Sequence, residues 1–156
     1  MRLMNRCLGV TMALLAPLAA AQENLGALLD AGARKLSAEE FQQEVVQRAL
    51  VGPSATGGSI EVTYTGNGIV QGIGTPPNHS QTRSWVHSVQ ISGLWTIDAS
   101  ERVCTSMRIF TAGGGGAFGS YLPPRCQFWL KLSDKYFLSD SDSDRSAKVL
   151  IRTLKQ

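Results

Sequence analysis

The stretch 59–68, SIEVTYTGNG, decides the fold of this 156-residue chain. Within it the apolar residues Ile60, Val62 and Tyr64 alternate with polar ones, which is the period of a β-strand with one buried face. The sequence TGNG at 65–68 then predicts a tight turn into a second strand. We therefore expect a β-hairpin here, and the same two-residue period recurs along the rest of the chain.

Strand signals follow one another with only short turns between them. Beyond the first strand they cover residues 68–73, 85–89, 94–97, 103–109, 126–132, 136–138 and 147–154. A succession of about eight strands without helical crossovers excludes a parallel βαβ architecture. The fold is expected to be mainly β, an antiparallel meander curled into a small barrel or a tightly rolled sheet, because closure removes exposed strand edges. A two-sheet β-sandwich is the alternative.

A glycine-rich segment lies at residues 112–124. Residues 114–119 match the spacing G-x-G-x-x-G, but a dinucleotide site needs a helix directly after this motif. Pro123 and Pro124 follow closely instead, and they disfavour such a helix. The segment is therefore predicted to be a loop, and no cofactor is predicted for the chain.

One short amphipathic helix is predicted to precede the strands. The sequence SAEE at 37–40 is a capping box, and apolar residues follow at near-helical spacing as far as Leu50. Gly52 and Pro53 are expected to end this helix, which would then plug or cover the β fold. Residues 22–36 have a mixed composition, and we expect them to be partly ordered at most.

The first 21 residues have the pattern of a secretory signal peptide. Arg2 and Arg6 precede an apolar run at 8–21, which is shorter than the ~20 residues of a membrane-spanning helix. Small residues at 19 and 21 predict cleavage after Ala21. The expected organisation is a signal peptide (1–21), an N-terminal segment (22–36) and a single helix-plus-β domain (37–156), in a periplasmic or secreted protein whose mature chain has no integral membrane segment.

Charge and cysteine content agree with an exported protein. The chain has 15 basic and 12 acidic residues, and a net charge of +3 is too small and too scattered to indicate nucleic-acid binding. Loss of Arg2 and Arg6 leaves 13 against 12, a net charge of +1. Cys7 would leave with the signal peptide, so Cys104 and Cys126 remain in a compartment where disulfides persist. We expect them to form a structural disulfide that stabilises the fold by roughly 3 kcal/mol.

Catalytic and metal-binding patterns are weak. His87 with Ser80 or Ser84 would be the basis of a small hydrolase, but no Gly-x-Ser-x-Gly nucleophile elbow is present. Three carboxylates at alternate positions are candidate divalent-ion ligands: Asp140, Asp142 and Asp144. An EF-hand loop would need Gly at its sixth position and Glu at its twelfth, where this chain has Arg145 and Ile151. A solvated acidic hairpin, which also discourages edge-to-edge pairing, explains these aspartates better.

Aromatic residues on the predicted strands suggest a second kind of site. Trp85, His87 and Trp129 are candidate ligand-facing residues if the barrel mouth forms an apolar pocket. Most small barrels fill their interior with such side chains instead.

Several short motifs carry a resemblance to a family: LSAEE at 36–40, GLWTI at 93–97, Cys104, RC at 125–126 and KYF at 135–137. With them the chain resembles small secreted or periplasmic proteobacterial domains of unknown function. The resemblance implies export and a β fold, and it carries over no active site. The sequence thus predicts an exported, non-catalytic binding or accessory protein of the bacterial envelope, whose partner is a small apolar ligand or an envelope protein; the small hydrolase is the alternative.

Overall fold

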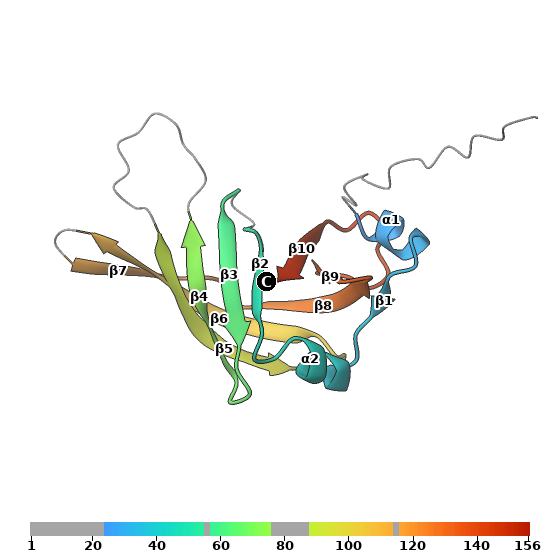
Figure 1. Ribbon diagram of the computed structural model, residues 1–156, viewed down its shortest axis with the longest axis horizontal. Coiled ribbons are helices and arrows are strands. Elements are labelled where there is room, and N and C mark those ends of the chain that lie inside the picture. Colours follow the sequence, from blue (N-terminus) through green and yellow to red (C-terminus); the bar gives the residue numbers. More distant parts are fainter. Residues whose placement is uncertain (1–23, 55–56, 76–87, 114–115) are drawn as a thin grey trace, which may run out of the picture.

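The chain forms a closed eight-stranded antiparallel β-barrel in the computed structural model, which describes residues 24–54, 57–75, 88–113 and 116–156 (Figure 1). Its elements are α1 (Leu25–Asp30), β1 (Arg34–Lys35), α2 (Ala38–Glu44), β2 (Ala49–Pro53), β3 (Ser59–Tyr64), β4 (Ile69–Thr75), β5 (Val89–Ile97), β6 (Val103–Gly113), β7 (Gly116–Tyr121), β8 (Arg125–Leu132), β9 (Lys135–Ser139) and β10 (Val149–Leu154). The predicted signal peptide lies outside the described residues.

The barrel strands run in the order β8-β9-β10-β2-β3-β4-β5-β6, and a pairing between β6 and β8 closes the ring. All of these pairings are antiparallel, and most join strands that are consecutive in the sequence. The predicted barrel is therefore confirmed. β1 and β7 are additional strands, attached to β8 and β6 respectively.

The hairpin predicted at residues 59–73 is confirmed. β3 and β4 pair from Ser59↔Thr75 to Tyr64↔Val70, with the turn at 65–68 between them. Gly68 has a φ of 81°, a left-handed conformation that glycine adopts without steric cost. The local turn chemistry thus sets the register of this pair.

α2 begins where the capping box predicts. The Ser37 hydroxyl accepts a hydrogen bond from the Glu40 N–H, and the Glu40 carboxylate accepts one from the Ser37 N–H. The predicted end of the helix is wrong, because α2 stops at Glu44 and residues 49–53 form β2. Leu50 was expected to lie on this helix. It lies instead on β2, where its side chain belongs to the barrel core, opposite Val62 of β3.

The N-terminal segment is ordered from Asn24 onward, which corrects the expectation of partial order at most. Asn24 caps α1 by accepting from the Ala27 N–H, and Leu25 and Leu28 are fully buried. These two leucines pack with Leu130 and Phe137, so that α1 covers part of β8 and β9. A helix of six residues is stabilised by this packing rather than by its own propensity.

Two further segments differ from the sequence-based expectation. Residues 89–97 form one uninterrupted strand, whereas two separate strands, at 85–89 and 94–97, were expected. The glycine-rich segment contains the end of β6 and the whole of β7, and is not wholly a loop. Pairing with β6 explains this difference, since residues of low intrinsic β-propensity still form a strand when a neighbouring strand supplies the hydrogen bonds.

Aromatic side chains fill the barrel interior next to α2. Phe41 of α2 makes edge-to-face contacts with Tyr64, Trp95 and Trp129, at ring-centroid distances of 5.5, 5.5 and 5.0 Å. Burial raises the pKa of Tyr64 to about 12. Figure 1 shows α2 at one end of the barrel, so this helix closes that end and supplies the ring at the centre of the cluster.

Candidate functional site on the outer face of the barrel

The large exposed apolar side chains of the described residues gather on one outer face of the barrel. Ile73 on β4, Leu94 on β5 and Tyr121 on β7 are 51%, 64% and 71% exposed. We use the term outer apolar face for these three residues together with Ile69 and Phe110. Contiguous exposed apolar surface of this kind commonly marks an interaction site.

Strand register brings the members of the outer apolar face together. Ile69 lies opposite Leu94 across the β4–β5 pair, and Arg108 lies opposite Tyr121 across the β6–β7 pair. Ile73 and Phe110 are separated by one strand, because both lie opposite Gln90. These residues come from four strands spread over more than 50 positions of the chain, and only the folded sheet makes them neighbours.

Two hollows lie on this face. The first has a volume of about 500 Å³, and its lining includes Glu61, Gln71, Ile73, Gln90 and Phe110. The second has a volume of about 390 Å³ and is lined mainly by Ile69, Leu94, Ser106, Arg108, Phe110 and Tyr121. Phe110 lines both hollows, so they are adjacent parts of one grooved surface.

Glycines form part of the floor of each hollow. Gly72 lines the first and Gly93 lines the second. A Cβ atom on Gly72 would lie 2.0 Å from the carbonyl oxygen of Glu61, and one on Gly93 would lie 2.1 Å from that of Ser106. The backbones of neighbouring strands therefore approach at these points more closely than any side chain allows, and the grooved surface depends on both glycines.

Arg108 is the one positively charged side chain that lines the second hollow. Its guanidinium lies 4.8 Å from the ring centroid of Phe110 and 4.4 Å from that of Tyr121, so it stacks against two aromatic rings. Within the part of the chain that the structure describes, no carboxylate lies within 4.0 Å of it. The site thus combines apolar side chains with a guanidinium that has no ion-pair partner among the described residues.

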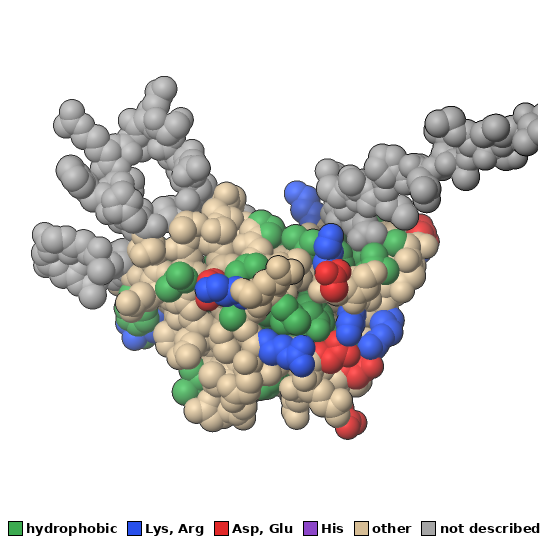
Figure 2. All heavy atoms as spheres, in the orientation of Figure 1, with side chains coloured by type: hydrophobic (Ala, Val, Ile, Leu, Met, Phe, Trp, Pro, Cys, Tyr) green, Lys and Arg blue, Asp and Glu red, His purple; other side chains and the backbone are tan. Residues whose placement is uncertain are grey.

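Several charged side chains near α2 are, in contrast, paired with one another. Glu44 accepts hydrogen bonds from Lys131 and from the Tyr136 hydroxyl, and the hydrogen bond from Lys131 lowers the pKa of Glu44. Arg34 forms ion pairs with both Glu40 and Glu44. Figure 2 shows red and blue side chains side by side over this end of the molecule. These ion pairs and hydrogen bonds stabilise the packing of α2 against the barrel.

Of the sequence-predicted ligand-facing residues, only Trp129 lies in the part of the chain that the structure describes. Trp129 is 2% exposed and packs between Phe41, Tyr64 and Tyr136, so it belongs to the core. Trp85 and His87 lie outside the described residues, as do Ser80 and Ser84 of the hydrolase hypothesis. No described contact favours either the pocket or the hydrolase.

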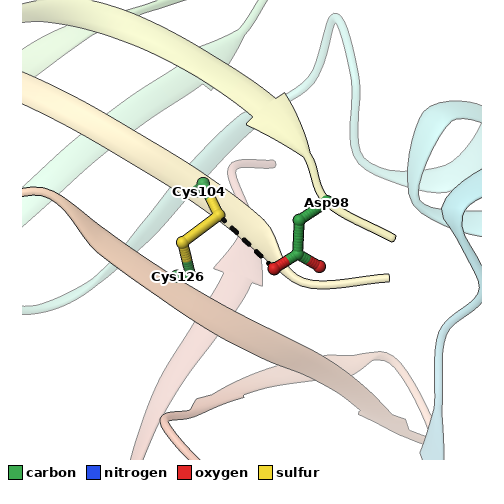
Figure 3. A group of neighbouring side chains, drawn as sticks. All are labelled: Asp98, Cys104 and Cys126. Atoms are coloured by element: carbon green, nitrogen blue, oxygen red, sulfur yellow. Dashed lines mark hydrogen bonds between the residues drawn. A yellow bond between two sulfur atoms is a disulfide. The ribbon is translucent and has the colours of Figure 1, made fainter. Parts of the chain in front are cut away.

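Cys104 and Cys126 form a disulfide between β6 and β8, as predicted (Figure 3). The carboxylate of Asp98 lies 3.9 Å from the Cys104 sulfur, and Asp98 also accepts hydrogen bonds from the Arg102 backbone and side chain. Hydrogen bonding by the Arg102 backbone is the main cause of the lowered pKa of Asp98. This trio has ligand-type atoms, but sulfurs joined to each other are not the thiolates that a metal ion requires.

The predicted acidic residues are dispersed among separate partners. Asp140 pairs with Arg125, Asp142 lies 4.0 Å from Lys35, and Asp144 accepts hydrogen bonds from Ser146 that lower its pKa. Of the described residues, only Asp98 with the disulfide forms a cluster of three metal-ligand atoms. The three carboxylates of the acidic loop therefore do not converge on a common point.

Comparisons of the chain with protein-family models, with curated proteins and with solved structures found no match. Neither of the helices in the described residues has the length and apolar character needed to cross a membrane.

Sequence reasoning missed the outer apolar face and Arg108. The sequence of β4 does not indicate which of its faces is buried, because Val70 on the inner side and Ile69 and Ile73 on the outer side are all apolar. Arg108 would have been noticeable as a charged residue in an apolar strand. Its position next to Tyr121 depends on the pairing of β7, a segment that the composition predicted to be a loop.

Proposed function

We propose that this chain is an exported, non-catalytic binding protein of the bacterial envelope that contacts a partner protein through its outer apolar face. One observation carries the proposal: Ile73, Leu94 and Tyr121, the large exposed apolar side chains of the described residues, all lie on that face. Burial of these side chains by a partner would stabilise the complex by roughly 25 cal/mol for each Å² of apolar surface removed from water. A surface of this kind supports protein binding better than catalysis.

Two features support an exported location. Residues 1–21 have the pattern of a signal peptide, and Cys104 and Cys126 are joined in a disulfide. Disulfides persist in oxidising compartments such as the bacterial periplasm.

A partner on the outer surface is favoured over a small ligand inside the barrel. The interior next to α2 is occupied by the rings of Phe41, Tyr64, Trp95 and Trp129. The hollows lined by the exposed apolar residues lie instead across the outer side of β3, β4, β5 and β6.

Site-specific photo-crosslinking in living bacteria tests this function. A benzophenone amino acid at Leu94 is expected to form an adduct of one defined mass with a partner protein. The same probe at Asp134, exposed in the β8–β9 turn across the barrel, is the matched control and is expected to give no such adduct. Adding Ile73→Ser to the Leu94 probe should reduce the yield severalfold. Equal adducts from both positions, or no adduct at Leu94, would contradict the proposal.

A further inference from the structure

β7 leaves one edge of the sheet open in the part of the chain that the structure describes. On one side it pairs with β6, from Arg108↔Tyr121 to Gly113↔Gly116, and no other described strand pairs with it. Figure 1 shows β6 and β7 extending together beyond the barrel wall. The free edge of such a strand presents backbone N–H and C=O groups that can pair with another chain.

The opposite edge strand, β1, has the features by which proteins discourage such pairing. It is two residues long, and both residues, Arg34 and Lys35, are charged and exposed. β7 has six residues with the sequence GAFGSY, which contains neither a charge nor a proline. β7 therefore lacks the short length and the charged residues that discourage pairing at β1.

The direction of the free backbone groups follows from the β6–β7 ladder. Leu122 donates its N–H to the Met107 carbonyl at 2.9 Å. Backbone hydrogen bonds alternate along an antiparallel pair, so Tyr121 and Gly119 occupy positions that are not hydrogen-bonded to β6. Their N–H and C=O groups point away from β6, where an added strand would meet them.

Arg108 supplies a charge near this edge. Its side chain starts on β6, yet the guanidinium stacks 4.4 Å from the ring centroid of Tyr121 on β7. The acidic residue that lines the first hollow, Glu61, is already bound by Lys155 at 2.9 Å. Among the described residues Arg108 has no ion-pair partner, so an acidic side chain of a partner protein would find its guanidinium free of other carboxylates of this described part, and the planar group would offer it two parallel hydrogen bonds.

We propose that β7 binds an extended segment of the partner protein as an added β-strand, and that an acidic side chain of this segment is bound by Arg108. The proposal rests on the function proposed above. It specifies the segment that the partner supplies: an exposed strand of alternating side chains that carries Asp or Glu on one face. A second copy of this chain fits less well. Residues 116–124 contain no acidic residue, so pairing of two β7 strands would leave Arg108 without a carboxylate.

Binding of two synthetic peptides to the mature protein tests the proposal. Both are seven residues long with alternating Thr and Val, and they differ only at the central position, which is Glu in one and Lys in the other. NMR titration is expected to shift the amide signals of Gly119 and Tyr121, with the Glu peptide binding about fivefold more tightly. The preference should vanish in Arg108→Gln and reverse in Arg108→Glu.

A matched pair of variants isolates the backbone contribution. Ala117 lies opposite Ala112 in the same alternation as Gly119 and Tyr121, so its N–H also points to the free edge. Ala117→Pro removes that donor without breaking a hydrogen bond to β6, whereas Ala117→Val keeps it. We expect Ala117→Pro to weaken binding of the Glu peptide at least tenfold and Ala117→Val to change it less than twofold. The amide spectrum of each variant reports whether the barrel is intact.

Several outcomes would overturn the added strand: no binding of either peptide at millimolar concentration, equal binding by the two alanine variants, or concentration-dependent dimers that Ala117→Pro abolishes. None of these outcomes decides the proposed function, which depends on the Leu94 adduct. An adduct that persists in Ala117→Pro means that the partner uses the outer apolar face without pairing to β7. If the protein that carries only the probe at Leu94 forms no adduct, the proposed function itself is refuted.

Discussion

Gly72 shows how one residue shapes the outer surface. It pairs with Val62 of β3, and its Cα faces the neighbouring strand so closely that no Cβ fits. The obstructing atom is the backbone carbonyl oxygen of Glu61, which cannot rotate away as a side chain would. Any side chain at this position must therefore move β3 or β4, two of the strands that line the first hollow.

Gly72→Ala is expected to lower the free energy of unfolding by about 2 kcal/mol, the usual cost of forcing extra volume into a packed site. Urea unfolding followed by tryptophan fluorescence measures this change. Gly66→Ala is the matched control, since its Cβ would lie 3.5 Å from the Gln47 side chain, an ordinary contact. The control should change stability by no more than about 0.5 kcal/mol. Equal losses in the two variants would show that backbone contact at Gly72 is not the cause.

At the scale of elements, α2 depends on a local signal and on a distant one. Its first turn is fixed by the reciprocal hydrogen bonds of Ser37 and Glu40, and its buried residue, Phe41, packs into the aromatic cluster. The cap places the helix start, and the packing of Phe41 holds the helix against the open barrel end.

Ser37→Ala is expected to cost about 1 kcal/mol of unfolding free energy, because the Glu40 N–H loses its acceptor. Ser100→Ala serves as the comparison, since Ser100 is exposed in the β5–β6 turn and uses its backbone N–H to bind Asp98. That variant should be nearly neutral. Thermal and urea unfolding of both variants give the difference, and a neutral Ser37→Ala would show that Phe41 alone positions the helix.

The elements that the sequence predicted well are those with local chemistry. The turn at 65–68 and the capping box at 37–40 need only neighbouring residues, and both form as expected. β7 and α1 need distant partners: β6 supplies hydrogen bonds to one, and β8 and β9 supply an apolar surface to the other. Composition and periodicity hold no information about such partners, so these two elements could not be predicted.

The candidate site was beyond sequence reasoning for a related reason. Tyr121 and Arg108 are separated by 13 positions and meet only through the β6–β7 register. The choice between Val70 and Ile73 as the core residue of β4 depends on which side faces the barrel axis. Periodicity identifies two faces of a strand, but only the closed sheet decides which of two apolar faces is exposed.

For the molecule as a whole, closure of the ring includes two short pairings, and β10 and β2 pair at two positions, Thr153↔Val51 and Leu154↔Leu50. β6 and β8 pair at only three positions, Val103↔Gln127, Cys104↔Cys126 and Thr105↔Arg125, whereas β5 and β6 pair along nine. The disulfide lies at the middle of these three pairs. A covalent bond thus reinforces one of the two short pairings of the ring.

Replacing both cysteines by alanine should therefore lower the free energy of unfolding by roughly 3 kcal/mol, the value for a cross-link that closes a loop of this length. The loss of protection from local opening should differ from one part of the barrel to another. Amide hydrogen exchange is expected to accelerate most at residues 103–105 and 125–127, because the cross-link no longer keeps β6 and β8 together when their backbone hydrogen bonds open. The hairpin of β3 and β4, on the far side of the ring, is the internal reference and should keep most of its protection. Uniform acceleration in both regions would mean that the disulfide acts only through the unfolded chain and has no particular role in closing the barrel.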